Sequence, residues 1–230
     1  MDTRTYANLR NLLLIGLIAS VITVLGGELP IGWTEYPRVE NDPMGLTGMM
    51  LGSANLSLLQ LACGVLFGGV GIALQYYGFE GAAQLVAQGG SRRAAKLIHL
   101  GAAATAGLGG IVHVICVALM FLCRMADFSS GTLPQPLLDF ALWLVLPISA
   151  VFMPVYYAMT IALFATVVRG KTCLPRWAAV FNPLAGTLVL NALPLLLPAT
   201  ALVNALGMAN MGVGSVLTFG GMLALLKKPE

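Results

Sequence analysis

Two side chains in this sequence combine acid–base chemistry with an otherwise apolar setting: the carboxyl group of Glu28 and the imidazole of His113. Carboxyl and imidazole groups are common general acids and bases. Ionisable residues within long apolar segments are expensive to bury and are candidates for functional sites by default. Two glycines precede Glu28, and glycine lets a backbone or a ligand approach closely. Glu28 and His113 are therefore the candidate acid–base pair.

Each of the two residues also has a structural interpretation, which the sequence leaves open. His113 shares a helix face with small residues such as Gly110, so it can lie against a neighbouring helix and simply form a hydrogen bond with it. Glu28 stands two residues before Pro30 and can instead be a carboxylate that ends a helix in water. Cys116 lies one helical turn from His113, but no further ligands complete a zinc site, so neither a metal nor another cofactor is expected.

Four further polar residues are candidates for binding a ligand: Gln60, Asp139, Asn191 and Asn210. With a rise of about 1.5 Å per residue, His113 and Asn191 both fall roughly 5 Å outward of the bilayer centre. Asn210 lies slightly further outward, Gln60 lies nearer the outer mouth and Asp139 lies at the rim. All of them collect in the outer half of the predicted bundle, although a hydrogen bond between helices is the favoured interpretation of Asn210.

The elements that position these residues are long apolar segments. Hydrophobic residues make up 58 % of the chain and charged residues 9 %, whereas soluble domains carry about 25 % charged residues; the mean hydropathy is +0.88. Several apolar runs exceed the roughly 20 residues that a helix needs to cross a bilayer. The sequence therefore predicts a single all-α transmembrane domain, residues 1–230, with six helices. The predicted spans are residues 11–29, 57–79, 97–123, 137–168, 177–197 and 205–226, with an outer loop at residues 30–56.

Basic residues predict the orientation of this bundle, because cytoplasmic loops of membrane proteins carry an excess of lysine and arginine. If both termini are cytoplasmic, ten of the twelve basic residues lie on the inner side, and only Arg38 and Arg124 lie outside. The ten inner residues are Arg4, Arg10, Arg92, Arg93, Lys96, Arg169, Lys171, Arg176, Lys227 and Lys228. The N- and C-termini are therefore expected in the cytoplasm.

Motifs of well-known enzyme classes are absent from the sequence. It contains no GxSxG nucleophile elbow, no HExxH zinc helix and no Walker loop. No basic cluster with interleaved aromatic residues suggests a nucleic acid as partner. The four cysteines lack CxxC spacing and are interpreted as apolar packing residues. The expected partners are the lipid bilayer and a hydrophobic ligand, and the sequence leaves a homo-oligomer open.

The stretch CLPRWAAVFNPL, residues 173–184, resembles the start of the fifth span in an uncharacterised family of bacterial six-span membrane proteins, a domain of unknown function. The family is also similar in a glycine–acid segment that ends the first span (here residues 27–29), a histidine on the third span (His113) and an asparagine that starts the last span (Asn210). Its acid is usually aspartate, so Glu28 departs from the pattern. The resemblance implies the architecture, a shared site and a place in the bacterial inner (cell) membrane. The glycine–acid segment is also faintly similar to lysoplasmalogenase-type membrane hydrolases, which have more spans and further motifs.

Three functions agree with these observations. The favoured one is an integral membrane protein that binds or moves a hydrophobic small molecule or lipid through an outward-opening intramembrane pocket. The sequence shows no catalytic constellation, and Pro147 and Pro154 can act as hinges in the fourth span. The first alternative is a small intramembrane enzyme that acts on a lipid-like substrate with Glu28 and His113 as its acid–base pair, and whether the chain is an enzyme stays open. The second alternative is a structural subunit of a membrane complex.

Overall fold

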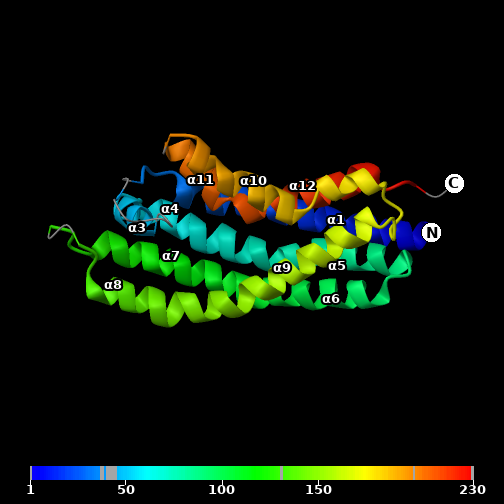
Figure 1. Cartoon of the computed structure of the whole chain (residues 1–230), viewed down its shortest axis with the longest axis horizontal. Helices are drawn as coiled ribbons and strands as arrows, with labels where there is room; N and C mark the ends of the chain where they lie inside the picture. The colour runs from blue at the N-terminus through cyan, green and yellow to red at the C-terminus, as the bar shows by residue number, and fades with distance from the viewer. Residues whose placement is uncertain (1, 37–38, 40–45, 130–131, 199, 229–230) are drawn as a thin grey trace.

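Helices that run along one common axis make up the structure (Figure 1). The computed structural model describes residues 2–36, 39, 46–129, 132–198 and 200–228, and every regular element within these ranges is a helix. Both ends of the chain lie at the same end of the bundle, together with the turn that joins α5 (Val70–Gln88) to α6 (Arg92–Ala104). The predicted all-α fold is confirmed for these residues.

Four helices are long and apolar enough to cross a membrane, and each contains a π-helical segment. They span Thr3–Gly32, Leu58–Gln88, Arg92–Met125 and Gln135–Val168, with 30, 31, 34 and 34 residues. The segments that compose them, besides α5 and α6, are α1 (Thr3–Ile22), η1 (Thr23–Glu28), α2 (Leu29–Gly32), α4 (Leu58–Cys63), η2 (Gly64–Gly69), η3 (Thr105–Gly109), α7 (Gly110–Met125), α8 (Gln135–Phe140), η4 (Ala141–Val145) and α9 (Leu146–Val168). Since about 20 residues cross the hydrocarbon core, each of the four is long enough even when it is tilted.

Side chains at the helix starts explain where two of these helices begin. The Asp2 carboxylate accepts hydrogen bonds from the backbone amide of Thr5 at 2.9 Å and from its hydroxyl at 2.7 Å, which caps α1. Ser57 and Gln60 form a capping box before α4, in which each side chain accepts a hydrogen bond from the backbone amide of the other, at 3.2 Å and 2.9 Å. The first turn of a helix leaves its N–H groups unpaired, so such caps stabilise the helix start.

The C-terminal part of the chain differs from the continuous helices predicted at residues 177–197 and 205–226. It consists of the 3₁₀ turn η5 (Arg176–Val180) and the helices α10 (Pro183–Leu196), α11 (Ala201–Met208) and α12 (Asn210–Leu225). The side chain of Asn182 accepts a hydrogen bond from the amide of Leu184 at 2.9 Å, so α10 has a cap of its own and does not continue η5. The helices α11 and α12 are bent by 63° relative to each other. The predicted last span is therefore a broken helix.

By length and composition the described structure contains four candidate membrane spans, or five if the bent pair α11–α12 counts as one. The predicted count of six spans is therefore not established by helix length. α10 is an apolar helix of 14 residues, which extend about 21 Å and are shorter than the hydrocarbon core. Large apolar side chains such as Leu59, Trp143 and Leu188 are exposed on the outside. Such a surface suits lipid rather than water, so the chain has the helices and the surface of a membrane protein.

The predicted outer loop at residues 30–56 is partly helical, because it contains the end of the first helix and α3 (Leu46–Ser53). It is also tied to the C-terminal helices, since the Asn204 side chain on α11 donates a hydrogen bond to the Thr34 carbonyl at 2.8 Å. Residues 37–38 and 40–45 of this loop lie outside the described residues, and so does the predicted outer charge Arg38.

Three clusters of buried apolar side chains hold the described part of the bundle together, and two of them border the same pocket. The larger of these two includes Phe79 and Phe219, whose ring centroids lie 4.9 Å apart in an edge-to-face arrangement, and it also includes Tyr156. The second one joins Ile31 and Met120, each of which lies near the C-terminal end of its long helix. Tyr156, Ile31 and Met120 also line a common pocket, so that pocket lies where the two clusters meet.

Candidate functional site

A pocket of about 150 Å³ lies inside the bundle, and all four long helices and the bent pair α11–α12 contribute to its wall. Most of its lining is apolar and includes Met120, Met208 and Met211. Methionine side chains are flexible and adapt to ligands of different shapes. An apolar cavity of about this volume, engineered in another protein, holds benzene. The polar residues in the wall are Glu28, Gln75, Thr105, His113 and Tyr156.

π-helical segments border this pocket on three of the long helices. Glu28 is the last residue of η1, and Thr105 and Gly109 are the first and last residues of η3. The segment η2 begins at Gly64, whose carbonyl group contacts the pocket residue His113. π-helical turns within α-helices are rare and occur frequently at functional sites. The local backbone geometry therefore marks the same part of the bundle as the pocket does.

The carboxyl group of Glu28 lies in the pocket wall with one oxygen unpaired. The residue is 6 % exposed, and its Oε2 atom has no hydrogen-bond partner within the described part of the chain. The backbone amide of Gly212, in the first turn of α12, faces this carboxyl group, and a Cβ atom at Gly212 would overlap Oε2. The break between α11 and α12 thus places a helix N-terminus, which carries a partial positive charge, beside a buried acid.

Three hydroxyl groups gather beside Glu28, from α9, α10 and α12. The Tyr156 hydroxyl is buried, interacts with the charge of Glu28 and lies near the hydroxyls of Thr187 and Ser215. The oxygens of Tyr156 and Thr187 make no hydrogen bond within the residues described, whereas the Ser215 hydroxyl donates to the carbonyl of Met211 at 3.0 Å. Buried polar groups are nearly always paired. Two of these oxygens, those of Glu28 and Tyr156, lie in the pocket wall, which makes this the strongest candidate for a ligand site in the described structure.

One ring nitrogen of His113 is hydrogen-bonded within the protein. Its Nε2 atom donates a hydrogen bond to the Gly64 carbonyl at 3.0 Å, because a carbonyl oxygen can only accept. In a neutral ring the lone pair is then on Nδ1. The ring lies directly on Gly68, where a Cβ atom would overlap Nε2. Both Glu28 and His113 line the pocket, but no hydrogen bond joins these two described residues.

The other two polar residues in the wall are hydrogen-bonded within the protein. Gln75 is buried and donates from Nε2 to the Thr23 hydroxyl at 3.3 Å, which links the second long helix to the first. The Thr105 hydroxyl donates to the Gly101 carbonyl, one turn earlier in its own helix, at 2.9 Å. These two groups give the wall some polarity without leaving an unpaired atom of the kind found at Glu28.

The family model of DUF6796, a family of unknown function, matches residues 1–229. The chain belongs to DUF6796. No curated protein and no solved structure matches it. The predicted membership of an uncharacterised family is thereby confirmed, and the match includes every helix that encloses the pocket.

In this DUF6796 member, Gln60 and Asn210 form hydrogen bonds with the backbone and do not line the pocket. Besides its part in the capping box, Gln60 donates from Nε2 to the Pro30 carbonyl at 2.8 Å, which joins the start of the second long helix to the end of the first. Asn210 donates from Nδ2 to the Gly207 carbonyl at 2.6 Å, across the break between α11 and α12. The Gln60 side chain therefore links two long helices, and the Asn210 side chain bridges the break between α11 and α12.

The remaining two predicted binding residues, Asp139 and Asn191, are exposed and do not line the pocket either. Asp139 accepts a hydrogen bond from Gln135 Nε2 at 2.8 Å, one turn earlier on α8. Asn191 lies on α10, which contributes no residue to the pocket wall. The structure thus brings Glu28 and His113 to one pocket and places the other four predicted site residues outside it.

Within the described ranges, no three His, Cys, Asp or Glu side chains gather closely enough to hold a metal ion. Cys116 lines the pocket together with His113, and all four cysteines are free thiols. The groups available for chemistry in the pocket are therefore a carboxyl, an imidazole, hydroxyls and a thiol.

Proposed function

We propose that this protein binds or moves a hydrophobic small molecule or lipid whose polar end contacts Glu28 and Tyr156 in the central pocket. The observation that carries the proposal is the buried, unpaired Oε2 atom of Glu28 beside the unpaired Tyr156 hydroxyl. A buried polar group without a partner costs about 1–3 kcal/mol. A ligand with a hydrogen-bond donor at one end and an apolar body offsets that cost and fits the mainly apolar wall.

The broken helix α11–α12 supports this reading over a purely structural role. In membrane transporters, helices broken within the bilayer often point their N-termini at anionic groups of the site. Here the first turn of α12 meets the carboxyl group of Glu28 in the same way. Pro154 lies inside α9, between the pocket residues Phe152 and Tyr156, and a proline within a helix weakens the backbone hydrogen bonding there. Both features favour a pocket whose walls can move.

The test compares the molecules that co-purify with the protein in lipid, identified by mass spectrometry. Glu28→Gln and Tyr156→Phe remove the two proposed contacts, and Glu35→Gln is the matched control because Glu35 is an exposed carboxyl group of the outer loop. We expect an amphiphile that is retained by the wild type and by Glu35→Gln and is reduced about tenfold in the pocket variants, as loss of one good hydrogen bond predicts. Equal retention by all four proteins would overturn the proposal.

We further propose that six segments cross a bacterial inner membrane, with α10 as the fifth, and that both termini face the cytoplasm. The support is the course of the chain: α10 runs back along the bundle, so the chain returns once more before α12 leads to the C-terminus (Figure 1). The basic turns before α6 and after α9 also lie at the end that carries both termini, as the positive-inside rule requires of a cytoplasmic face.

The second proposal is an intramembrane enzyme that acts on a lipid-like substrate. Its support is that Glu28 and His113 share one pocket and that the Gly64 contact directs the lone pair of a neutral His113 to Nδ1. General acid–base catalysis typically contributes about 10²–10⁴-fold to a rate. In His113→Ala, turnover of the bound molecule is then expected to fall by that factor while the ligand is still retained. Unchanged turnover in a folded His113→Ala protein would rule the enzyme out.

A further inference from the structure

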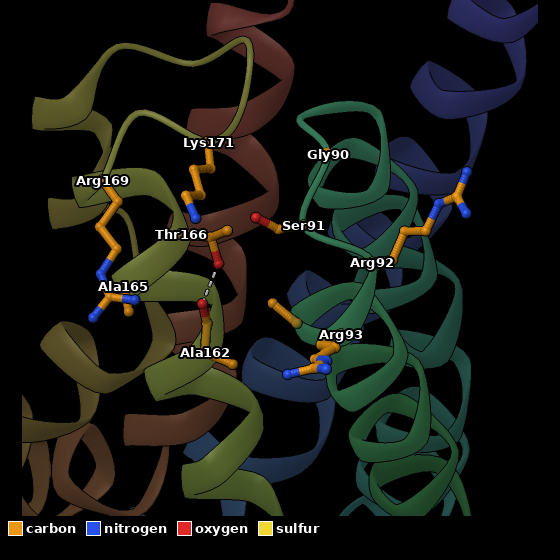
Figure 2. A pocket seen from close by; sticks show the side chains of 10 residues that line it. Gly90, Ser91, Arg92, Arg93, Ala162, Ala165, Thr166, Arg169 and Lys171 are labelled. Carbon is orange, nitrogen blue, oxygen red and sulfur yellow. Dashed lines mark hydrogen bonds between the residues drawn. The ribbon is translucent and has the colours of Figure 1, made fainter.

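A second, larger pocket lies at the end of the molecule that carries both termini, between the start of α6 and the end of α9. Its volume is about 640 Å³, and Figure 2 shows the residues that line it. The polar ones are Ser91, Arg92, Arg93, Thr166, Arg169 and Lys171, and the rest are small residues. This basic pocket is separate from the central pocket, because no residue lines both.

The charge of the basic pocket is uncompensated. Four of its lining residues carry a positive charge, and none of its lining residues is an acid. A histidine–carboxylate contact in the described part of the chain lies elsewhere, between His99 Nδ1 and Glu80 Oε2 at 2.6 Å. Four cations gathered at one pocket repel one another, and the field that they create attracts an anion. The chemistry of the pocket therefore calls for an anionic ligand.

Two of the basic side chains lie toward the space between α6 and α9. In Figure 2 the Lys171 amino group and the Ser91 hydroxyl lie near Thr166, and the Arg93 guanidinium points from α6 toward α9. The guanidinium groups of Arg92 and Arg169 point away from this space. Thr166 donates its hydroxyl to the Ala162 carbonyl, whereas the Ser91 side chain makes no capping hydrogen bond to α6. The first backbone amides of α6 open at the same place and add to the attraction for an anion. Guanidinium, ammonium and hydroxyl donors together suit the oxygens of a phosphate group.

The surface on the membrane side of this pocket is apolar. Leu100 on α6 is 56 % exposed and Ile161 on α9 is 52 % exposed. Between these helices Gly101 lies against Met159, so closely that a Cβ atom there would be 2.5 Å from the Met159 Cβ atom. The helices α6 and α9 are therefore in close contact at this level, and the exposed apolar side chains on their outer faces are available to an acyl chain.

We propose that the basic pocket binds the phosphate group of an anionic membrane lipid, whose acyl chains lie against the exposed apolar side chains of α6 and α9. Basic pockets between helices at the cytoplasmic side of membrane proteins bind such headgroups. The site is independent of the function proposed for the central pocket. It would attach a lipid of the surrounding bilayer to the junction of the second half of α9 and the first half of α6.

The experiment measures the thermal unfolding temperature of the detergent-purified protein as phosphatidylglycerol, phosphatidylcholine or inorganic phosphate is added. The pocket variant is Arg93→Gln with Lys171→Gln. The control is Arg10→Gln with Lys96→Gln, which removes the same two positive charges from exposed positions that do not line the pocket. A ligand that binds the folded protein and not the unfolded chain raises the unfolding temperature, by an amount that grows with the logarithm of its concentration relative to its dissociation constant.

We expect phosphatidylglycerol to raise the unfolding temperature of the wild type and the control, with an apparent affinity about 100-fold weaker in the pocket variant, because two charge-assisted hydrogen bonds are lost. If inorganic phosphate raises the unfolding temperature of the wild type but phosphatidylglycerol does not, and the pocket variant loses this effect, the pocket binds a free phosphate from solution. That result would support a phosphate site and overturn its assignment to a lipid. Equal shifts for the pocket variant and the control, or equal shifts with phosphatidylcholine and phosphatidylglycerol, would overturn the proposal. If the double variant does not fold, the single variants Arg93→Gln and Lys171→Gln are compared with the wild type by native mass spectrometry, which counts the phosphatidylglycerol molecules that each protein retains. Fewer retained molecules in the single variants support the proposal, and equal numbers overturn it.

Discussion

Gly212 leaves the space that the carboxyl group of Glu28 occupies, and Gly68 does the same for the ring of His113. In both cases an ionisable side chain lies against the bare backbone of a neighbouring helix, at a distance that any larger residue would prevent. The central pocket therefore depends on residues that contribute no functional group. At the scale of single residues, the candidate site contains two pairs, each with one ionisable side chain and one glycine.

We predict that Gly212→Ala weakens both stability and ligand retention, because its Cβ atom overlaps Glu28 Oε2. Overpacking of this kind costs about 1–3 kcal/mol of unfolding free energy. The control is Gly220→Ala on the same helix, where the nearest atom to the new Cβ is Leu17 Cδ1 at 3.8 Å. There the better helix propensity of alanine is expected to stabilise the protein by up to ~1 kcal/mol. Denaturant unfolding in detergent measures both, and equal effects of the two variants would contradict the assignment.

Helix caps and helix breaks determine how the helices are arranged, in addition to the length of the apolar segments. Asn182 caps α10 and also donates from Nδ2 to the Thr160 carbonyl on α9 at 3.1 Å, so one buried side chain both starts a helix and holds it to its neighbour. Asn210 spans the break between α11 and α12. These elements position Thr187 and Gly212 around Glu28, and the site would not form if α10 or α12 continued straight.

We predict that Asn182→Ala destabilises the protein by about 1–3 kcal/mol, because it removes an N-cap and a buried hydrogen bond. Asn191→Ala is the matched control: the same substitution on the same helix at an exposed position. It should change the unfolding free energy by less than about 0.5 kcal/mol. Thermal unfolding in bicelles compares the two, and the prediction fails if Asn191→Ala is as damaging as Asn182→Ala.

The start of α1 should depend on pH through Asp2. Hydrogen bonds from the Thr5 hydroxyl and amide lower the pKa of the Asp2 carboxyl from its usual 3.8. A carboxyl whose pKa is lowered by folding stabilises the folded state above its unfolded pKa, and that stabilisation is lost as the pH falls through the folded value. Hydrogen-exchange protection of the Thr5 amide should therefore decline below about pH 4. In Asp2→Asn, which keeps a capping side chain without a titrating group, protection should not vary with pH in this range; the same decline in that variant would exclude Asp2 as its cause.

The whole molecule separates two kinds of chemistry along its long axis. The central pocket is apolar with one buried acid, and the basic pocket lies at the end with both termini. Apolar side chains surround the bundle between them. This distribution matches a bilayer that encloses the central pocket and ends near the basic one, and it makes the orientation of the molecule measurable.

We predict that Cys173, an exposed thiol in the turn after α9, lies on the cytoplasmic side. A membrane-impermeant maleimide should label it in inverted vesicles and not in intact cells, because the reagent does not cross the bilayer. Cys173→Ser should abolish this labelling, which separates it from any reaction of the three cysteines within the spans. Labelling in intact cells would reverse the proposed orientation of the chain.

Part of this protein could be predicted from its sequence because the relevant physics is local. Long apolar runs with few charges determine helices that suit a membrane, and an ionisable residue in such a run, like Glu28 or His113, stands out by itself. Hydroxyl residues do not stand out, because they commonly pair with their own helix, as Thr105 and Ser215 do. Nothing local distinguishes Tyr156 from its neighbour Tyr157.

Only the tertiary structure decided which helix faces meet. Contact between helices brings Tyr156 and Thr187 to Glu28, breaks the last helix beside that carboxyl group, and leaves Gln60, Asp139, Asn191 and Asn210 outside the pocket. Depth along a helix can be counted from the sequence, but direction around its axis depends on how neighbours pack, and π-helical segments rotate the faces that follow them. The sequence by itself therefore determined the class of molecule and pointed to two residues that line the central pocket, and packing between helices determined which other residues surround them.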